Sequence, residues 1–413
     1  MRTWSSVVIR LLPCVAGAVM LAASGGAASA PSGLPQNAAL VYYQALLFRS
    51  MFLHPPEDFY QVSSSFEPRF DPSSSVNSFV QSRDFQELIE LITAGSKMLQ
   101  CDWGLVRTAR LNTVHPVGGP MCDLTHFLVV RAKVSACDGR YKAALENALT
   151  MRRVSRHLGD DTPGMLYYSE SVNAHAFSVI QYVLGKMPPD VDTLTWLQQE
   201  LASGREVEWH PRETLTKWLD WQVECLQASP EFLAKVVENP LGLIPAPTRK
   251  KELEGLTPIQ VLERARLSWK ELLKGTLEII ESEKSPQEKY LTLKKLEDKV
   301  DATINEGDPI ALMPILRVAI STQYSGDANC RARVHAVHGA IAIYLIKATT
   351  GQLPETLPEG LPKDPYSGED FEYRPSEKGF ILRSRARPFG AADDTKIKQF
   401  EFQLASFSGS TSR

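Results

Sequence analysis

The sequence predicts a mainly α fold: an irregular, solenoid-like array of helical hairpins with a small C-terminal β-hairpin. Three observations predict it. Met121 to Leu158 shows helical spacing on both sides of a tight turn. Other long helical segments alternate with stretches rich in Pro, Gly and Ser. From Gly351 the pattern changes to closely spaced prolines, which forbid helix, and then to alternating aromatic residues.

The segment Met121–Leu158 is the predicted packing centre. Its turn is Asp138-Gly139-Arg140, and Gly139 can adopt the left-handed conformation that ends a helix. Small alanines on both sides allow the two helices to pack closely. The hairpin partly resembles one tetratricopeptide unit, but no second copy follows at the expected period, so an ordinary helical hairpin is the alternative. Its apolar stripes are Leu124, Phe127, Leu128, Ala132 and Ala136, then Tyr141, Ala144, Leu145, Ala148 and Leu149.

The remaining elements follow from the same pattern. Residues 55 to 81 hold four prolines and two serine triplets, so we expect a long loop there. The tail is expected to form a hairpin through Phe371–Tyr373 and Phe380–Leu382, with a third strand in Lys396–Leu404. The other predicted helices are Ala38–His54, Asp84–Gln100, Pro163–Gly185, Val191–Ala202, Pro211–Gln227, Pro258–Glu283, Pro286–Asn305 and Ala328–Thr350.

Length and linkers predict the domain organisation. A chain of 413 residues with 43% hydrophobic and 23% charged residues can bury a large core. Residues 239 to 257 carry three prolines and a basic cluster, which favours a linker. The predicted parts are a signal peptide (1–30), a helical lobe (31–240), a second helical lobe (241–350) and a β-rich tail (351–413).

The N-terminus has the pattern of a secretory signal peptide. Arg2 and Arg10 provide a basic region, Leu11–Ala23 is largely apolar, and small residues lead to Ala30. Cleavage after Ala30 places Pro31 first, so cleavage after Ala27 or Ala28 is the alternative. We therefore expect an exported protein, periplasmic or secreted, with no membrane span after removal of the signal. The net charge of −3 is too small and dispersed to indicate nucleic acid binding.

Five cysteines remain after signal removal, an odd number, so at least one is unpaired or pairs outside the chain. Cys101 and Cys122 flank a Gly- and Pro-rich segment, and we predict a disulfide between them. Cys137 lies near a predicted helix end and is expected to be a buried free thiol.

A resemblance concerns the tail. The run Gly351–Ser384 contains Leu-Pro-Lys-Asp-Pro followed by an aromatic hairpin, and it resembles the C-terminal part of type II secretion major pseudopilins. The whole chain more closely resembles uncharacterised exported helix-rich bacterial proteins that share this ending, a Cys-Asp-Trp element such as Cys101–Trp103 and an alanine-rich hairpin. The glycine- and aspartate-rich loop of pseudopilins is reduced here to Arg387–Asp394. The resemblance implies no established activity.

One group of side chains suggests a metal site. His335 and His338 are one helical turn apart, and Cys330 precedes them on the same predicted helix. Two imidazoles and a thiolate suit a soft metal ion. The alternative is two polar positions near the start of a helix.

Further candidates are weaker. Asp364, Asp370, Asp393 and Asp394 suggest a calcium site, with solvated turns as the alternative. Acid–base pairs could form from His157 with Asp160 and Asp161, or from Glu170 with His175; capping roles at helix ends are the alternative. Trp209, Trp218 and Trp221 with His210 could stack on a sugar, whereas an aromatic helix face is usually core.

No nucleophile elbow, nucleotide-binding loop or zinc-protease motif is present in the sequence. The sequence therefore favours an exported, non-catalytic binding or scaffold protein that presents a helical groove to an envelope protein or peptide. The alternative is an envelope hydrolase, possibly metal-dependent, with its site near His157 and His175 or at His335 and His338.

Overall fold

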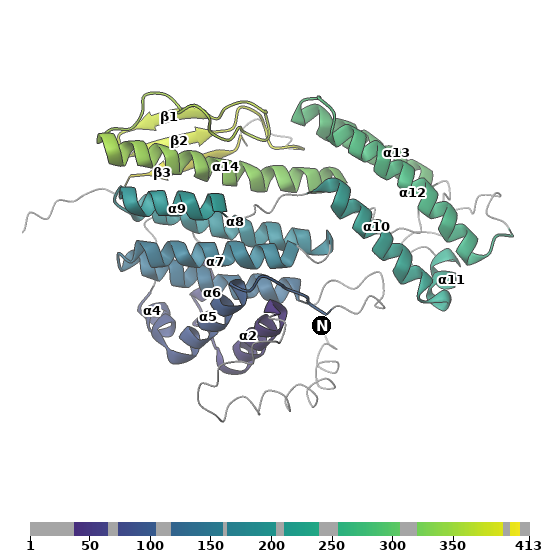
Figure 1. Ribbon diagram of the computed structural model, residues 1–413, viewed down its shortest axis with the longest axis horizontal. Helices are drawn as coiled ribbons and strands as arrows, with labels where there is room; N and C mark the ends of the chain where they lie inside the picture. Colours follow the sequence, from purple (N-terminus) through teal and green to yellow (C-terminus); the bar gives the residue numbers. More distant parts are fainter. Residues whose placement is uncertain are drawn as a thin grey trace, which may run out of the picture. The chain divides into compact units, whose positions relative to one another are not determined.

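The computed structural model describes residues 37–64, 73–104, 117–159, 163–203, 210–238, 255–305, 320–390 and 397–404. All of them belong to one compact unit, residues 37–413. The predicted fold class is confirmed: the unit is mainly α with a small three-stranded antiparallel sheet near its C-terminal end (Figure 1). The signal peptide predicted for residues 1–30 lies outside the described residues.

The predicted packing centre forms the hairpin of α6 (Gly118–Cys137) and α7 (Tyr141–Gly159). Gly139 has φ +75°, and the amides of Gly139 and Arg140 donate to the carbonyls of Ala136 and Ser135. These two bonds form the Schellman motif, which satisfies two of the carbonyls at the end of α6. The helix α8 (Pro163–Lys186) packs along both, and residues of all three helices are fully buried.

The N-terminal part contains α2 (Ala38–Phe52) and α5 (Arg83–Ser96), which pack against each other. The loop predicted for residues 55–81 is wrong in part, because α3 (Phe59–Ser64) and α4 (Ser74–Gln81) lie within it. A contact with a distant part of the chain helps to form α3. Lys133 of α6 is buried, and its Nζ donates to the carbonyls of Val62 (2.5 Å) and Ser63 (3.4 Å), which the short helix α3 cannot satisfy itself. Ser73 caps α4 locally.

The middle of the chain holds α9 (Val191–Ser203), α10 (Pro211–Gln227), α11 (Pro230–Glu238), α12 (Pro258–Ile280) and α13 (Pro286–Asn305). Helix α11 was not predicted. Helices α10, α11 and α12 share a second hydrophobic core that includes Leu226 and Trp269. The predicted boundary at residue 240 places α10 in the first helical lobe and α12 in the second. In the structure the two helices pack together. The division of the chain into two lobes stays a prediction.

The last helix, α14 (Ile320–Thr350), begins eight residues before its predicted start at Ala328. Its first turn is stabilised by α13, because the Glu297 carboxylate accepts from the Ser321 amide and hydroxyl, both at 2.6 Å. A carboxylate at a helix N-terminus also interacts favourably with the helix dipole. Helix α14 packs on α8, α9 and α13.

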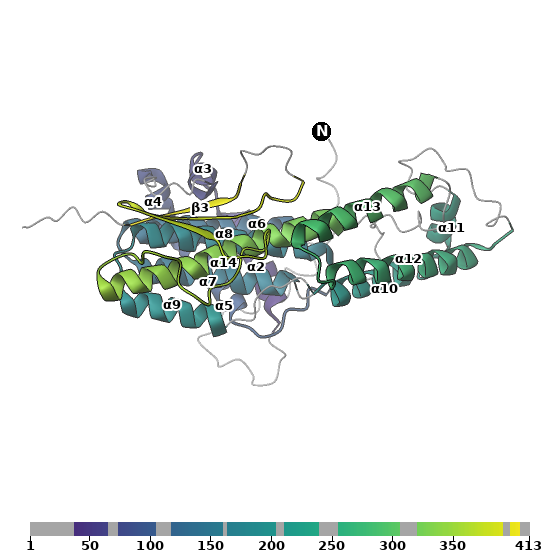
Figure 2. The same cartoon turned by 90° about the horizontal axis from the view of Figure 1, so that it is seen from above.

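The predicted hairpin and third strand are confirmed as β1 (Glu372–Ser376), β2 (Gly379–Arg383) and β3 (Gln399–Gln403). The strands are antiparallel in the order β1-β2-β3, and Phe380 pairs with Phe402. The sheet lies on α14 and α8 (Figures 1 and 2), where Tyr344 donates to the Gln403 carbonyl (2.6 Å) and Gln181 to the Glu401 carbonyl (2.8 Å).

Among the described helices, none combines the length and apolar character that crossing a membrane requires.

Candidate functional site

The Cys101–Trp103 element is anchored to the start of α2. The Asn37 side chain donates to the Asp102 carbonyl (2.7 Å) and accepts from the Asp102 amide (2.9 Å). Trp103 is buried; its ring stacks on Tyr42, and its Nε1 donates to the His157 carbonyl (3.1 Å). The element therefore joins α2 to the end of α7.

His157, a predicted acid–base residue, is held by two hydrogen bonds. Its Nε2 lies 3.0 Å from the Met98 carbonyl, which can only accept, so Nε2 carries the proton. In the neutral ring, Nδ1 then accepts from the Tyr42 hydroxyl at 2.8 Å. Burial raises the pKa of Tyr42 well above its ordinary value, so the hydroxyl remains a donor. This geometry gives His157 a structural role; Asp160 and Asp161 lie outside the described residues.

The predicted metal residues Cys330, His335 and His338 make separate contacts in the structure, and the metal site stays a prediction. Nδ1 of His335 donates to the Lys363 carbonyl in the tail (2.6 Å). Cys330 instead contacts α8, and burial raises the pKa of its thiol to about 12. Burial, followed by nearby Arg152, lowers the pKa of His338 to about 4, and its ring lies beside Phe177. Among the described residues, no three His, Cys, Asp or Glu side chains are placed to hold one metal ion.

The predicted disulfide between Cys101 and Cys122 is not formed in this structure; the pairing stays a prediction. Cys122 is half-buried, and burial raises the pKa of its thiol to about 11. The expectation that Cys137 is buried is wrong, because it is exposed at the end of α6 beside Lys186.

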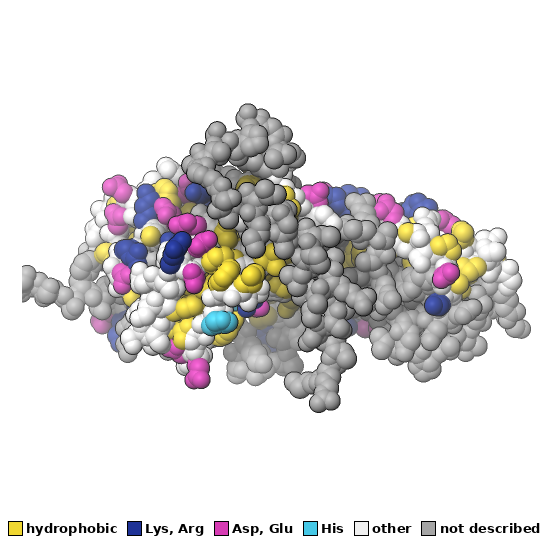
Figure 3. Space-filling view, turned by 90° about the horizontal axis from the view of Figure 1, so that it is seen from below, with side chains coloured by type: hydrophobic (Ala, Val, Ile, Leu, Met, Phe, Trp, Pro, Cys, Tyr) yellow, Lys and Arg dark blue, Asp and Glu magenta, His cyan; other side chains and the backbone are white. Residues whose placement is uncertain are grey.

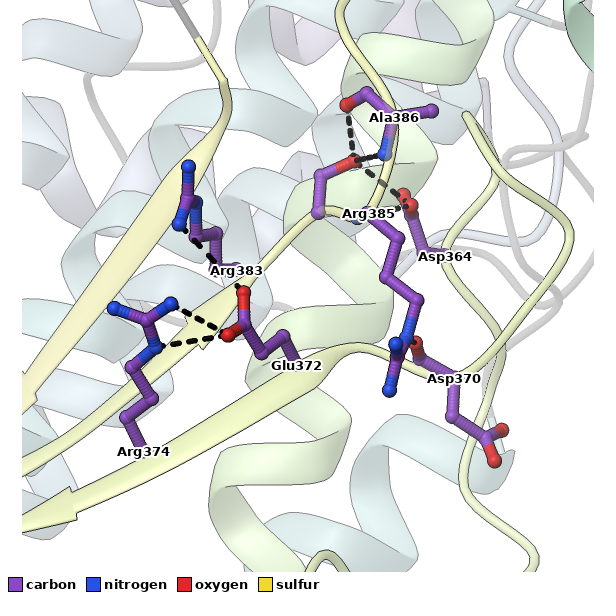
Figure 4. Close-up of polar contacts among 8 residues, drawn as sticks. Asp364, Asp370, Glu372, Arg374, Arg383, Arg385 and Ala386 are labelled. Atoms are coloured by element: carbon purple, nitrogen blue, oxygen red, sulfur yellow. Dashed lines mark hydrogen bonds and ion pairs between the residues drawn. The ribbon is translucent and has the colours of Figure 1, made fainter.

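Asp364, a predicted calcium ligand, is buried among hydrogen-bond donors (Figure 4). Its carboxylate accepts from the hydroxyls of Ser367 and Ser384, both at 2.7 Å, and from the amides of Tyr366 and Arg385. Donors surround the oxygens that a cation would need, so Asp364 organises the tail instead. Asp370 offers its carbonyl to Arg385 (2.8 Å), and Asp393 and Asp394 lie outside the described residues.

The predicted aromatic platform is mostly core. Trp218 is buried in α10, and Trp221 packs against both hydrophobic cores. His210 precedes α10 and is exposed, whereas Trp209 lies outside the described residues.

Glu170 and His175, predicted as an acid–base pair, have different neighbours. Glu170 faces α14, where its Oε1 accepts from Gln323 (3.1 Å) and its neighbour is Asp327. Burial and the Asp327 charge raise the pKa of Glu170 to about 8, so this carboxyl is protonated at neutral pH. A buried acid beside a carboxylate can act as a proton donor. Sequence spacing could not reveal it, because Asp327 comes from another helix.

His175 instead faces His126 of α6, and the ring centroids are 5.3 Å apart. Sequence analysis did not identify His126. Its only sequence signal is a histidine within a helix rich in apolar residues, which is not specific.

The α2 surface is the second feature that sequence analysis missed. Helix α2 turns Ala38, Ala39, Tyr42 and Ala45 toward the core and exposes other large apolar residues. Hydrophobic side chains gather on the face of the molecule that carries α2 (Figure 3). We define the α2 surface as the exposed residues Leu40, Leu47, Met51 and Phe52 of α2 with Tyr60 of α3.

Comparison with known proteins gives no match: no family model, no curated protein and no solved structure is similar to this chain. The resemblance of the tail to major pseudopilins therefore stays a prediction.

Proposed function

We propose that this chain is an exported, non-catalytic binding protein whose α2 surface binds an apolar helix of a partner protein. The observation that carries the proposal is the orientation of α2. Leu40, Leu47 and Met51 recur at helical spacing on its outer face, while three alanines and Tyr42 occupy its inner face. Leaving large apolar side chains in water forgoes roughly 1.5–3 kcal/mol for each one that a partner could cover.

The composition of the α2 surface favours a protein over a lipid surface. Helices that lie in a membrane interface carry Lys and Arg on their polar face. Helix α2 has one charged residue, Arg49, which pairs with Asp123 (3.5 Å) and donates to the Tyr60 hydroxyl (3.2 Å). Aromatic residues, Met and Arg with few other charges are typical of protein–protein interface cores. An apolar ridge on a helix fits a partner helix with its own apolar stripe.

Site-specific photo-crosslinking in cells that naturally produce the protein tests this proposal. A photoreactive residue replaces Met51 in one variant and Leu267 of α12 in the other; the two side chains are matched in exposure, 64% and 63%. We expect one distinct protein product at position 51 that is absent at position 267. The partner, identified by mass spectrometry and purified, should bind M51E at least tenfold more weakly than wild type, and L267E as tightly as wild type.

Three results would overturn the proposal: identical products at both positions, a product containing two copies of this chain, or crosslinking to lipid alone. The proposal would also be overturned if M51E and L267E bound the purified partner with equal affinity.

The alternative function, an envelope hydrolase, has its best support in Glu170, since its pKa of about 8 suits a general acid. Turnover of cell-wall peptides or glycans by the purified chain, lost in E170Q, would favour this function. The absence of turnover at micromolar enzyme would exclude it for those substrates.

A further inference from the structure

Two histidines meet between α6 and α8, and the His126 ring also lies beside Tyr60 of the α2 surface, with the ring centroids 5.9 Å apart. The rings of His126 and His175 are tilted by 49° with their centroids 5.3 Å apart. Nδ1 of each ring is shielded from solvent and has no hydrogen-bond partner among the described residues. A buried polar atom without a partner destabilises the fold, so two of them side by side need a physical explanation.

Both rings are in the form that binds metal ions. Burial lowers the pKa of His126, and burial followed by the nearby His126 lowers that of His175 to about 4. The cations Arg49, Lys133 and Arg333 act in the same direction, and only Asp123 opposes them. Each ring is therefore neutral at physiological pH and keeps a nitrogen lone pair available for coordination.

The same two helices make a second polar contact one turn away. Cys122 precedes His126 by four residues on α6. The Cys122 thiol donates to the Tyr168 carbonyl of α8 (3.9 Å). Two successive turns of α6 thus bring polar side chains against α8.

We propose that His126 and His175 bind a copper ion through their Nδ1 atoms. Imidazole nitrogen suits copper, and copper(II) binds nitrogen ligands more tightly than the other divalent first-row metals do. Within the described residues no third His, Cys, Asp or Glu completes the set, so the two imidazoles are the protein ligands of the proposed site.

Titration of the metal-free full chain with copper(II) sulfate, in the presence of glycine as a competing chelator, tests the site. We expect one copper ion per chain by native mass spectrometry. The variants H126F and H175F keep a ring in each place but remove its nitrogens, and each should weaken copper binding at least tenfold. Copper bound to the wild type should show coupling to two imidazole nitrogens in its electron paramagnetic resonance spectrum.

The matched control is the double variant H335F/H338F, which removes the two histidines of the other predicted metal site and should bind copper as the wild type does. Copper binding lost in this control but kept in H126F and H175F would overturn the proposal. So would a wild type that retains no copper against glycine. If a variant fails to fold, the wild-type spectrum still decides, because a signal with only oxygen ligands contradicts the two-histidine site.

Discussion

The Tyr42 hydroxyl lies 2.8 Å from Nδ1 of His157 and thereby joins the first described helix to the end of α7. Both side chains are buried, and Trp103 stacks on the tyrosine. The Cys-Asp-Trp element of the sequence thus completes a polar contact inside the core, which explains its residue types by packing and hydrogen bonding.

Removal of that hydroxyl should destabilise the protein. In Tyr42→Phe the buried His157 Nδ1 loses this donor, and we expect the free energy of unfolding to fall by about 1–3 kcal/mol. Urea denaturation of both proteins measures this change in the free energy of unfolding. Tyr43→Phe is the control, because the Tyr43 hydroxyl donates to the Trp103 carbonyl from a less buried position. Equal losses in both variants would contradict a special contribution from the Tyr42–His157 contact.

The raised pKa of Glu170 predicts that the stability of the protein falls as the pH rises. In the folded chain its carboxyl stays protonated up to a pH of about 8, whereas in the unfolded chain it ionises above the ordinary glutamate pKa of 4.5. The folded state therefore binds the extra proton between these values, and the free energy of unfolding falls as pH rises from 4.5 to 8. Glu170→Gln should remove this decline and be the more stable protein at pH 9. Chemical denaturation at a series of pH values measures the free energy of unfolding of the wild type and of Glu170→Gln. If the two proteins show the same pH dependence, the predicted role of Glu170 is wrong.

Asp364 should matter for the tail more than its neighbour Asp370. In Asp364→Ala the buried Ser384 hydroxyl, the half-buried Ser367 hydroxyl and two amides lose their common acceptor, and we expect a loss of about 3 kcal/mol in stability. Asp370→Ala removes an exposed side chain and should change stability by less than about 0.5 kcal/mol. Thermal unfolding with hydrogen exchange of residues 372–383 measures both; comparable exchange in the two variants would refute the role of Asp364.

Two glycines with the same conformation should respond differently to alanine. Gly139 and Gly390 both have φ +75°, where a Cβ costs roughly 1–2 kcal/mol. A Cβ on Gly139 meets no atom within 4 Å, but one on Gly390 would lie 2.7 Å from the Tyr290 hydroxyl. We therefore expect Gly390→Ala to cost more than Gly139→Ala in urea denaturation. The reverse order would show that Tyr290 moves aside freely.

Much of the fold followed from local pattern. The bounds predicted for α10 and α13 agree with the structure, since each begins at a proline and the apolar spacing continues to its end. The β-hairpin was predictable because Phe380 and Leu382 alternate with more exposed neighbours.

The candidate sites were much less predictable. The spacing of His335 and His338 placed both on one helix correctly, but their contacts lie with different parts of the chain. His126 and His175 come together only because α6 and α8 pack against each other. Helical periodicity reports which residues share a face, not which face meets which.

The sequence by itself determined the helical character of the chain, the turn at Gly139 and the change to strands after Gly351, because backbone conformation and apolar spacing are local properties. Tertiary structure alone decided that Lys133 completes α3, that Glu297 caps α14 and that Glu170 lies beside Asp327. These depend on burial and on charges distant in sequence, whose energies appear only when packing removes the groups from water.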